Sequence, residues 1–391
     1  MKKMEQIKVV FLGTLPPIIG LSPYCLHLSL ALSKRVDLIF FNFHRFSCAS
    51  RKFMRSAEIN RDLYIKHIKR LNVKNCIDWY NPISSIKVGS QLEGDVLHVQ
   101  WWLSLLIAVY LPIILCAKIK NIKVVMSIHN VLPHERSKIN LFIDKIFNKI
   151  VFRFANHFIV HNERNKQKLI DVYRIDENKI SIITHGAFDL VKSNNISQKV
   201  ARKHLGLPEK SKILLFFGYI RKYKGVDILI QAFSHLRKEF DDVILLIVGQ
   251  PIDDDWGKYD ELIRKNGLEN VVILEPGFVP EDEVKYYFSA SDVVVLPYKY
   301  LDTHGGVGAL ALSFNKPLIV TDVGGLPEYV KDMRAVVKPN DVNELYKKLK
   351  TILENEILLR KLGKDSKRLR KKLSWDNIAD KTVKVYKKVL M

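Results

Sequence analysis

Short apolar runs alternate with amphipathic helical patterns along almost the whole chain. In the first half these runs predict β-strands at residues 7–12, 36–41, 96–99, 124–128 and 157–160. Runs such as VVMSI and HFIV are nearly continuous in apolar residues, which is typical of parallel strands buried on both faces. Strands that alternate with helices predict βαβ units and therefore a parallel sheet.

A second series of strands follows a polar stretch at residues 192–203. It is predicted at residues 213–217, 243–248, 271–274, 293–296 and 318–320, each followed by a loop and a helical pattern. This α/β pattern predicts two doubly wound domains, one over residues 1–195 and one over residues 205–372. The tail, residues 373–391, predicts a terminal helix that packs on one of the domains, with Ser374 as its candidate cap.

The most apolar segment is WWLSLLIAVYLPIILC, residues 101–116. It is shorter than the ~20 residues that span a bilayer, and it contains Pro112. We expect a buried helix here. A helix lying at a membrane interface stays open as an alternative, because Trp101 and Trp102 begin the run and Lys118 and Lys120 follow it.

The chain of 391 residues is 48% hydrophobic and 27% charged, as globular chains are, and carries a formal net charge of +22. That charge favours an anionic partner: nucleic acid, an anionic membrane surface or a phosphorylated substrate. A solvated, lysine-rich surface explains it equally well. The sequence has no helix-turn-helix, zinc spacing or aromatic RNA-binding signature, so we expect no nucleic-acid partner.

The four cysteines are scattered and include no C-x-x-C pair. They therefore predict neither a disulfide framework nor a zinc site. Reduced thiols, together with an N-terminus that lacks the apolar core of a signal peptide, indicate a cytoplasmic location.

Candidate chemistry is sought in the loops after each strand, because ligands of doubly wound folds bind beyond the carboxyl ends of the strands. The first loop, GTLPPIIGLSPY, leads into a helix with Ser22 as its predicted cap and Pro23 in its first turn. Its glycines and free helix-start amides suit an anion. The spacing is not G-x-G-x-x-G, and a tight strand-to-helix turn explains the loop equally well.

Two further strand ends carry histidines. IHNVLPHE places His129 directly after a buried strand, where it can bond a sugar oxygen. The alternative is a core histidine that backbone groups satisfy. SIITHGAFD places His185 and Asp189 at a similar strand end.

The segment FFGYIRKYKGVDILIQAF places Arg221 and Lys224 between a strand end and a helix that starts near Gly225. Cations beside a helix start make a strong diphosphate site, since their charges add to the free N–H groups. The alternative is two solvated residues in a basic protein.

Residues 296–330 contain two glycine-rich strand-to-helix turns in close succession. Such turns can present backbone amides to phosphate and sugar oxygens, although structural glycines at tight turns explain them too. A helix is predicted between the turns, over residues 307–315. The residues of interest here are Asp302, Thr303, His304, Gly305, Gly306, Gly324, Gly325 and Glu328.

At these motifs the sequence resembles the retaining glycosyltransferases of family 4, which have the GT-B fold of two Rossmann-like domains facing a cleft. The resemblance covers nearly the whole chain. It is most specific in FFGYIRKYKGVDILIQAF, PGFVPEDEVKYYFSASDVVVLPY and NKPLIVTDVGGLPEYV, which occur in the family's order. GTLPPIIG and IHNV also match, and SWDNIADKTVKVYKKVL resembles the family's last helix, which packs back on the N-terminal domain.

The resemblance implies a nucleotide-sugar donor, retention of anomeric configuration, and a lipid-linked, glycan or small-molecule acceptor. It implies no cofactor and no required metal. Arg221 and Lys224 would hold the donor diphosphate as leaving group, and His129 would contact the transferred sugar. Lys224 matches its family position, whereas Arg221 stands two residues past the usual arginine position, which Tyr219 occupies. The implied donor-binding residues are Gly20, Phe278, Val279, Asp302, His304, Gly305, Gly306, Val307 and Glu328.

One departure from the family concerns its two glutamates, eight positions apart. Asp302 occupies the first position and Leu310 the second, which normally binds the nucleotide ribose. We interpret the chain as a divergent active member that acts at a membrane periphery. An inactive sugar-nucleotide-binding or scaffold protein of the same fold is the alternative.

Overall fold

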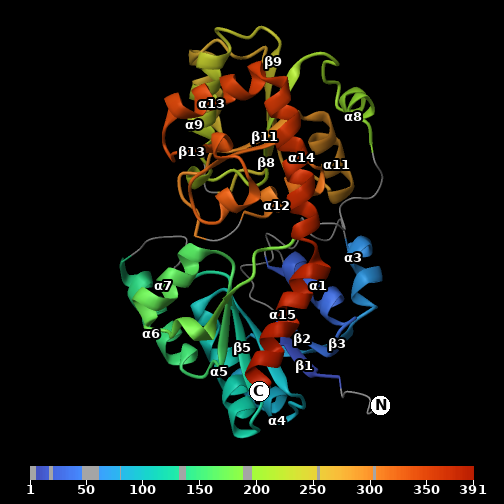
Figure 1. Ribbon diagram of the computed structural model, residues 1–391, viewed down its shortest axis with the longest axis vertical. Coiled ribbons are helices and arrows are strands. Elements are labelled where there is room, and N and C mark those ends of the chain that lie inside the picture. Colours follow the sequence, from blue (N-terminus) through green and yellow to red (C-terminus); the bar gives the residue numbers. More distant parts are fainter. Residues whose placement is uncertain are drawn as a thin grey trace. The chain divides into compact units, whose positions relative to one another are not determined.

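The computed structural model describes residues 6–16, 21–45, 61–79, 81–131, 138–187, 196–252, 256–302 and 305–391. The chain divides into two compact units. Unit 1 consists of Met1–Gly186 together with Trp375–Met391, and unit 2 is Ala187–Ser374. Each unit has its own parallel sheet with helices around it, as Figure 1 shows.

Unit 1 is built on a seven-stranded sheet of order β3-β2-β1-β4-β5-β6-β7, and its strand pairs are parallel. The inner strands are apolar and almost wholly buried, which confirms the predicted parallel sheet. The strands are β1 (Lys8–Leu12), β2 (Asp37–Arg45), β3 (Asn72–Asp78), β4 (Val96–Trp101), β5 (Lys123–Ile128), β6 (His157–Val160) and β7 (Ile180–Ile182).

Helices cover this sheet, and the chain's last helix belongs to them. Arg35, which follows α1, pairs with Asp380 at 2.6 Å and Asp376 at 3.0 Å, and the Trp375 ring stacks on His27. The tail therefore completes unit 1. The described helices are α1 (Ser22–Leu32), α3 (Arg61–Ile68), α4 (Pro82–Ser90), η3 (Ser104–Leu106), α5 (Ile107–Ile119), α6 (Lys138–Phe152), α7 (Glu163–Tyr173), η4 (Glu177–Lys179) and α15 (Trp375–Leu390).

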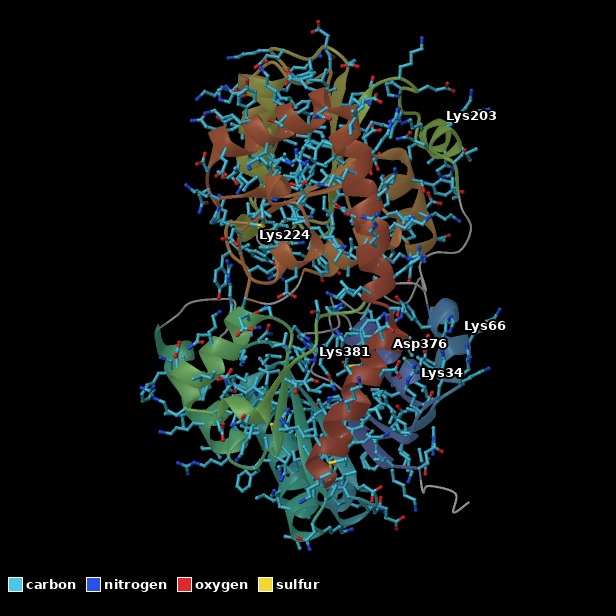
Figure 2. All side chains as sticks on the ribbon, in the orientation of Figure 1. Lys34, Lys66, Lys203, Lys224, Asp376 and Lys381 are labelled. Carbon is cyan, nitrogen blue, oxygen red and sulfur yellow. The ribbon has the colours of Figure 1, made fainter. Side chains whose placement is uncertain are left out.

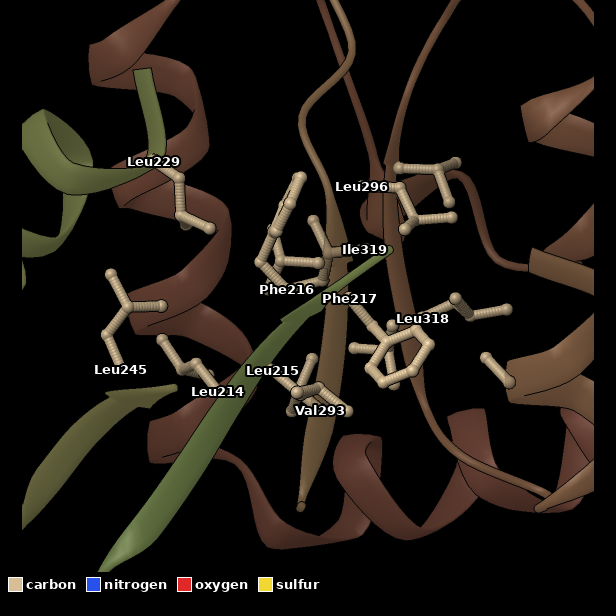
Figure 3. Close-up of a cluster of buried hydrophobic side chains, with 14 of the residues drawn as sticks. Leu214, Leu215, Phe216, Phe217, Leu229, Leu245, Val293, Leu296, Leu318 and Ile319 are labelled. Atoms are coloured by element: carbon tan, nitrogen blue, oxygen red, sulfur yellow. The ribbon is translucent and has the colours of Figure 1, made fainter. Parts of the chain in front are cut away.

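Unit 2 has a six-stranded parallel sheet of order β10-β9-β8-β11-β12-β13. Its strands are β8 (Lys212–Phe217), β9 (Val243–Gly249), β10 (Val272–Pro276), β11 (Val293–Leu296), β12 (Leu318–Thr321) and β13 (Val336–Val337). Side chains from β8, β9, β11, β12 and α9 meet in one apolar core, shown in Figure 3. Its helices are α8 (Gln198–His204), η5 (Lys222–Lys224), α9 (Val226–Leu236), α10 (Gly257–Lys265), α11 (Glu281–Ala290), α12 (Gly306–Ser313), η6 (Leu326–Tyr329), η7 (Met333–Ala335), α13 (Val342–Glu354) and α14 (Glu356–Lys372).

Two strands escape the apolar pattern. Strand β3, with the sequence NVKNCID, lies at an edge of its sheet and is largely exposed, so it needs no continuous apolar run. Strand β13 has only two residues. The position of each of these two strands is fixed by hydrogen bonds to its neighbour in the sheet, β2 for β3 and β12 for β13.

The prediction of one buried helix over residues 101–116 is wrong at its start. Trp101 ends β4, is 1% exposed and donates its indole N–H to Asn148 Oδ1 at 2.8 Å. The helix proper is α5, which keeps Pro112 inside it and buries Val109 and Ile113. Because Trp101 is buried, it cannot serve as an interfacial anchor, whereas Trp102, the other tryptophan of the membrane alternative, is half-buried.

Within the described ranges, no helix is both long and apolar enough to cross a membrane.

Candidate functional site

The strand order of unit 2 reverses between β8 and β11, and such a switch point is where doubly wound folds bind ligands. The loop after β8 carries Arg221 and Lys224, and the loop after β11 leads to α12. The sequence-predicted residues of these two loops therefore flank the same switch point.

Two contacts and one glycine fix these loops against each other. The Lys299 N–H donates to the Tyr223 carbonyl at 2.7 Å, and Lys299 Nζ pairs with Asp227 at 2.6 Å. Gly225 has φ of 70°, and a Cβ there would lie 2.1 Å from the Pro297 carbonyl oxygen. Only glycine fits this left-handed turn at such close approach, so the start of α9 is held rigidly.

Lys224 is buried, with 7% of its surface exposed. Its Nζ lies 5.4 Å from the centroid of the Tyr298 ring, and no described residue accepts a hydrogen bond from it or places a carboxylate within 4.0 Å. Burial first, and the Arg221 guanidinium second, lower the pKa of Lys224 to about 7. Figure 2 shows Lys224 inside the unit and the exposed Lys203 at its margin. Lys224 is therefore no solvated surface lysine.

A buried ammonium without a carboxylate partner is costly, and a bound anion would offset that cost. The nearby carboxylate of Asp227 is already paired with Lys299. Helix α9 begins at Val226, and Gly225 before it provides no side-chain cap, so the first N–H groups of the helix add to the same positive field. Arg221, which is half-buried, precedes this helix start. The arrangement is suited to a diphosphate.

Other predicted donor-binding residues come close to this lysine. A Cβ on Gly218 would lie 3.4 Å from Lys224 Nζ and 3.2 Å from Val307 Cγ2, so the lysine and Val307 converge over the backbone of Gly218. Gly305 caps α12 by its backbone alone, and Gly306 is exposed in the first turn.

The remaining predicted residues of unit 2 vary in exposure. Asp302 is fully buried, Phe278 is 37% exposed, and Val279 and Glu328 are half-buried. Leu310 lies on α12 and packs against the core of unit 2, so packing accounts for an apolar residue at this position. Gly20, His304 and Asp189 lie outside the described residues.

In unit 1, His129 follows β5 directly and is 8% exposed. Its Nε2 lies 2.9 Å from Gln100 Oε1, and its Nδ1 lies 3.0 Å from His161 Nε2. His161 Nδ1 lies 2.9 Å from the Ile183 carbonyl oxygen. Gln100 Nε2 lies 3.0 Å from His98 Nε2, and His98 Nδ1 lies 2.6 Å from the Tyr386 hydroxyl on α15.

The proton positions in this series of hydrogen bonds can be worked out from the group at its end, the Ile183 carbonyl. The Ile183 carbonyl only accepts, so His161 Nδ1 carries a proton. If Gln100 Oε1 faces His129, then His129 must donate to it from Nε2. His129 and His161 then carry three protons between them, one more than two neutral rings have. With the amide turned over, all three rings can be neutral: Gln100 Nε2 donates to His129 Nε2, and the proton on His98 Nε2 faces both Gln100 Oε1 and Ser127 Oγ, which lies 2.8 Å away.

Burial lowers the pKa of His129 well below its usual value and that of His98 to about 3, which favours the neutral chain. His129 is therefore a neutral imidazole whose nitrogens are both engaged, by side chains rather than by the backbone groups that the core alternative assumed.

Tyr24 of α1 gathers the other aromatic groups around His129. Its ring centroid lies 4.7 Å from that of His129, 5.0 Å from His185 and 5.2 Å from Trp375. The predicted His185 thus joins this cluster. The predicted cap of α1 is wrong: the Ser22 hydroxyl donates to Thr14 Oγ1 at 3.0 Å, and no side chain caps the helix.

Sequence reasoning missed Gln100, His98, His161 and Tyr24. His161 directly follows the buried strand HFIV, so the rule that selected His129 selects it too. Gln100 and His98 lie inside β4, where alternating buried polar residues gave no signal that they bond to a neighbouring strand.

Both halves of the chain match glycosyltransferase family models. Residues 197–369 match glycosyl transferases group 1, and residues 18–187 match Glycosyltransferase Family 4. The chain belongs to glycosyltransferase family 4. The resemblance seen in its motifs is thereby confirmed.

Relatives of this family member are moderately similar to it. It is 27% identical over 242 residues to a D-inositol 3-phosphate glycosyltransferase of Streptomyces bingchenggensis, covering 59% of this chain and 52% of that protein. It is 29% identical over 231 residues to an uncharacterised glycosyltransferase of Methanocaldococcus jannaschii, covering 57% of each. The chain thus spans about half the length of the curated relatives it matches.

Solved structures share the fold across nearly the full length. Anabaena HepE in complex with UDP superposes with a TM-score of 0.75 at 18% identity, covering 98% of this chain and 100% of that one. HepE has also been solved with UDP-glucose. The predicted GT-B class, with its two Rossmann-like sheets, is confirmed.

Proposed function

We propose that this protein is a glycosyltransferase that moves a sugar from a nucleotide-sugar donor to an acceptor hydroxyl with retention of anomeric configuration. The observation that carries the proposal is Lys224, a buried ammonium with no described acceptor at the switch point of a doubly wound sheet. A donor diphosphate supplies the missing negative charge.

In the proposed reaction, the bond between the sugar's anomeric carbon and the diphosphate oxygen breaks, and its electron pair leaves with the phosphate. Lys224, Arg221 and the first amides of α9 stabilise the charge that develops there. The acceptor oxygen bonds to the anomeric carbon on the same face, and its proton passes to the departing phosphate. His129 contacts the transferred sugar, and no cofactor or metal takes part.

The donor is a nucleoside-diphosphate sugar. HepE, which has the same fold, was solved with UDP and with UDP-glucose, and this supports a donor of that chemical class. The acceptor is a lipid-linked sugar, a glycan or a small molecule. Gly305, Gly306 and Val307 face the donor with Phe278, Val279, Asp302 and Glu328, and Gly20 and His304 complete the proposed set.

A second candidate is a protein that binds nucleotide-sugars without turning them over. Leu310 favours it, because an apolar side chain stands where the family places a ribose-binding glutamate. Loss of that carboxylate removes one polar anchor of the donor, although Lys224 keeps its place beside the α9 start.

The experiment is a donor screen with UDP-, GDP- and ADP-sugars. A ligand present at 100 times its Kd stabilises the fold by about 2.7 kcal/mol, which a thermal shift detects. We expect one nucleotide class to stabilise the protein and its sugar to be transferred or slowly hydrolysed. Binding without release of the sugar supports the second candidate. No shift with any donor, and no turnover, contradicts both.

A further inference from the structure

The outward face of helix α6 in unit 1 is apolar. Phe142 is 66% exposed, Ile146 41% and Ile150 38%, and they recur every four residues, so they form one stripe along the helix. Ile143, which is 37% exposed, widens it. Single exposed apolar residues are ordinary, whereas a contiguous stripe of this kind marks a contact surface.

The inward face of the same helix is held by polar groups. Asp144 accepts a hydrogen bond from Ser104 on η3, and Asn148 Oδ1 accepts one from the Trp101 indole at 2.8 Å. Asn148 Nδ2 also donates to the Tyr173 hydroxyl at 3.0 Å. Helix α6 therefore buries the contacts of Asp144 and Asn148 together with the core side chains Val151 and Phe152, and it leaves a second set of large apolar side chains outside.

A basic row runs beside the stripe. Lys145, Lys149 and Arg153 recur every four residues and are exposed. Among the described residues, no acidic side chain lies within 4.0 Å of their side-chain nitrogens. Their charges are therefore not neutralised locally, in a chain whose net charge is already +22.

We propose that α6 is a membrane-contacting helix that lies on an anionic bilayer. Phe142, Ile143, Ile146 and Ile150 enter the boundary between headgroups and acyl chains, and the basic row meets the lipid phosphates. A second copy of the chain fits this surface less well. A symmetric contact through α6 would bring two basic rows together, and their repulsion opposes association.

The inference deepens the proposed function, since a membrane-bound enzyme meets a lipid-linked acceptor at the bilayer surface. It moves the membrane contact away from the 101–116 segment, whose Trp101 is buried. It does not depend on transfer, because binding to a bilayer needs neither donor nor acceptor.

The test is co-sedimentation with vesicles of equal parts phosphatidylglycerol and phosphatidylcholine, compared with phosphatidylcholine alone. The apolar variant is Phe142→Asp with Ile146→Asp. Its control is Ile357→Asp, at an 84% exposed position on α14 of unit 2. The charge variant is Lys145→Glu with Lys149→Glu, and its control is Lys364→Glu with Lys367→Glu on α14, which makes the same change in net charge.

We expect the natural chain to bind the anionic vesicles at low salt, and each α6 variant to bind at least about tenfold more weakly. Both controls should stay within about twofold of the natural chain. Donor-induced thermal shifts should be the same in all five proteins, which separates a failure of this inference from a failure of the proposed function.

Three results would overturn the inference. The first is a natural chain that stays in the supernatant with anionic vesicles at low salt. The second is vesicle binding that the apolar α6 variant leaves unchanged. The third is a dimer in solution that Phe142→Asp with Ile146→Asp converts to a monomer, since the stripe would then bind a second copy of the chain.

Discussion

Lys224 and His129 both follow buried parallel strands, and the proposed function gives each of them a role. Their surroundings differ. Lys224 is buried with no described acceptor, and the face of the Tyr298 ring lies 5.4 Å from its Nζ. His129 is buried with both ring nitrogens bonded, to Gln100 and His161.

The difference separates two ways of building a polar site. A buried charge without a partner destabilises the free protein, and binding of an anionic ligand relieves that cost. Bonding a neutral ring on both sides fixes its orientation and tautomer before any ligand arrives, and leaves little capacity for a new hydrogen bond. We therefore expect Lys224 to lower the activation free energy of the reaction by more than His129 does.

The largest effect should come from Lys224→Ala. We expect at least a 100-fold loss of kcat/KM, because the proposed reaction then lacks the ammonium that stabilises the leaving diphosphate. The melting temperature should hold or rise, because the variant no longer buries an ammonium for which the described residues offer no acceptor. Steady-state transfer kinetics and thermal melts check both. Lys222→Ala, at an exposed neighbouring position, is the control and should stay within about twofold.

Turnover in Lys224→Ala close to that of the natural chain would contradict the role assigned to Lys224 and therefore its ranking above His129.

The second effect concerns His129→Ala. We expect a loss of roughly tenfold to fiftyfold in kcat, together with about 1–3 kcal/mol of stability, since Gln100 and His161 lose a buried partner. His157→Ala is the matched control: His157 is also buried, and bonds Ser181 Oγ at 2.9 Å from the first position of β6. It should lose stability and keep its activity. A larger activity loss than in Lys224→Ala would reverse the ranking.

The third effect is a pH dependence of donor affinity. Lys224 has a pKa of about 7 in the free protein, and a bound diphosphate should raise it. Binding is then flat below pH 7 and weakens by up to about tenfold per unit above it, until the pH reaches the pKa of the complex. Calorimetric titration with UDP between pH 6 and 9 measures this. In Lys224→Met the same slope should vanish.

The same lysine predicts how the stability of the free protein depends on pH. Its folded pKa of about 7 lies below the usual lysine value of about 10.4, so the unfolded chain binds more protons between these limits. The contribution of Lys224 to stability therefore rises with pH across that window.

The smallest effect should come from Gln100→Leu, since Gln100 is fully buried and would act only through its contact with His129 at 2.9 Å. We expect a roughly threefold to fivefold lower kcat with an unchanged KM. Gln100→Glu sharpens the test: a carboxylate beside Nε2 should raise the pKa of His129, so that activity falls as the pH falls towards that pKa. Identical pH profiles in the two variants would contradict a positioning role.

Much of the fold was predictable from the sequence. Buried parallel strands need apolar side chains on both faces, so ten inner and outer strands were recognised by their composition alone. Strand β3 was not, because its exposed edge position permits NVKNCID. Ser22 was predicted as a cap, but its hydroxyl is bonded to Thr14 on the preceding loop, a contact that no local pattern encodes.

The candidate site was predictable only in part. Arg221 and Lys224 were found because a cation before a helix start has a local signature. The chain from Tyr386 through His98 and Gln100 to His129 joins residues far apart in sequence, and no periodicity indicates which of them will bond.

The sequence by itself determined the two parallel α/β sheets, the family and the positions where chemistry is to be sought, because hydrophobic periodicity and turn residues act locally. The tertiary structure alone decided which titratable groups are paired. Whether a lysine stays without an acceptor, a histidine stays neutral or a helix turns apolar side chains outward depends on burial and on distant partners, and those exist only once the chain has folded.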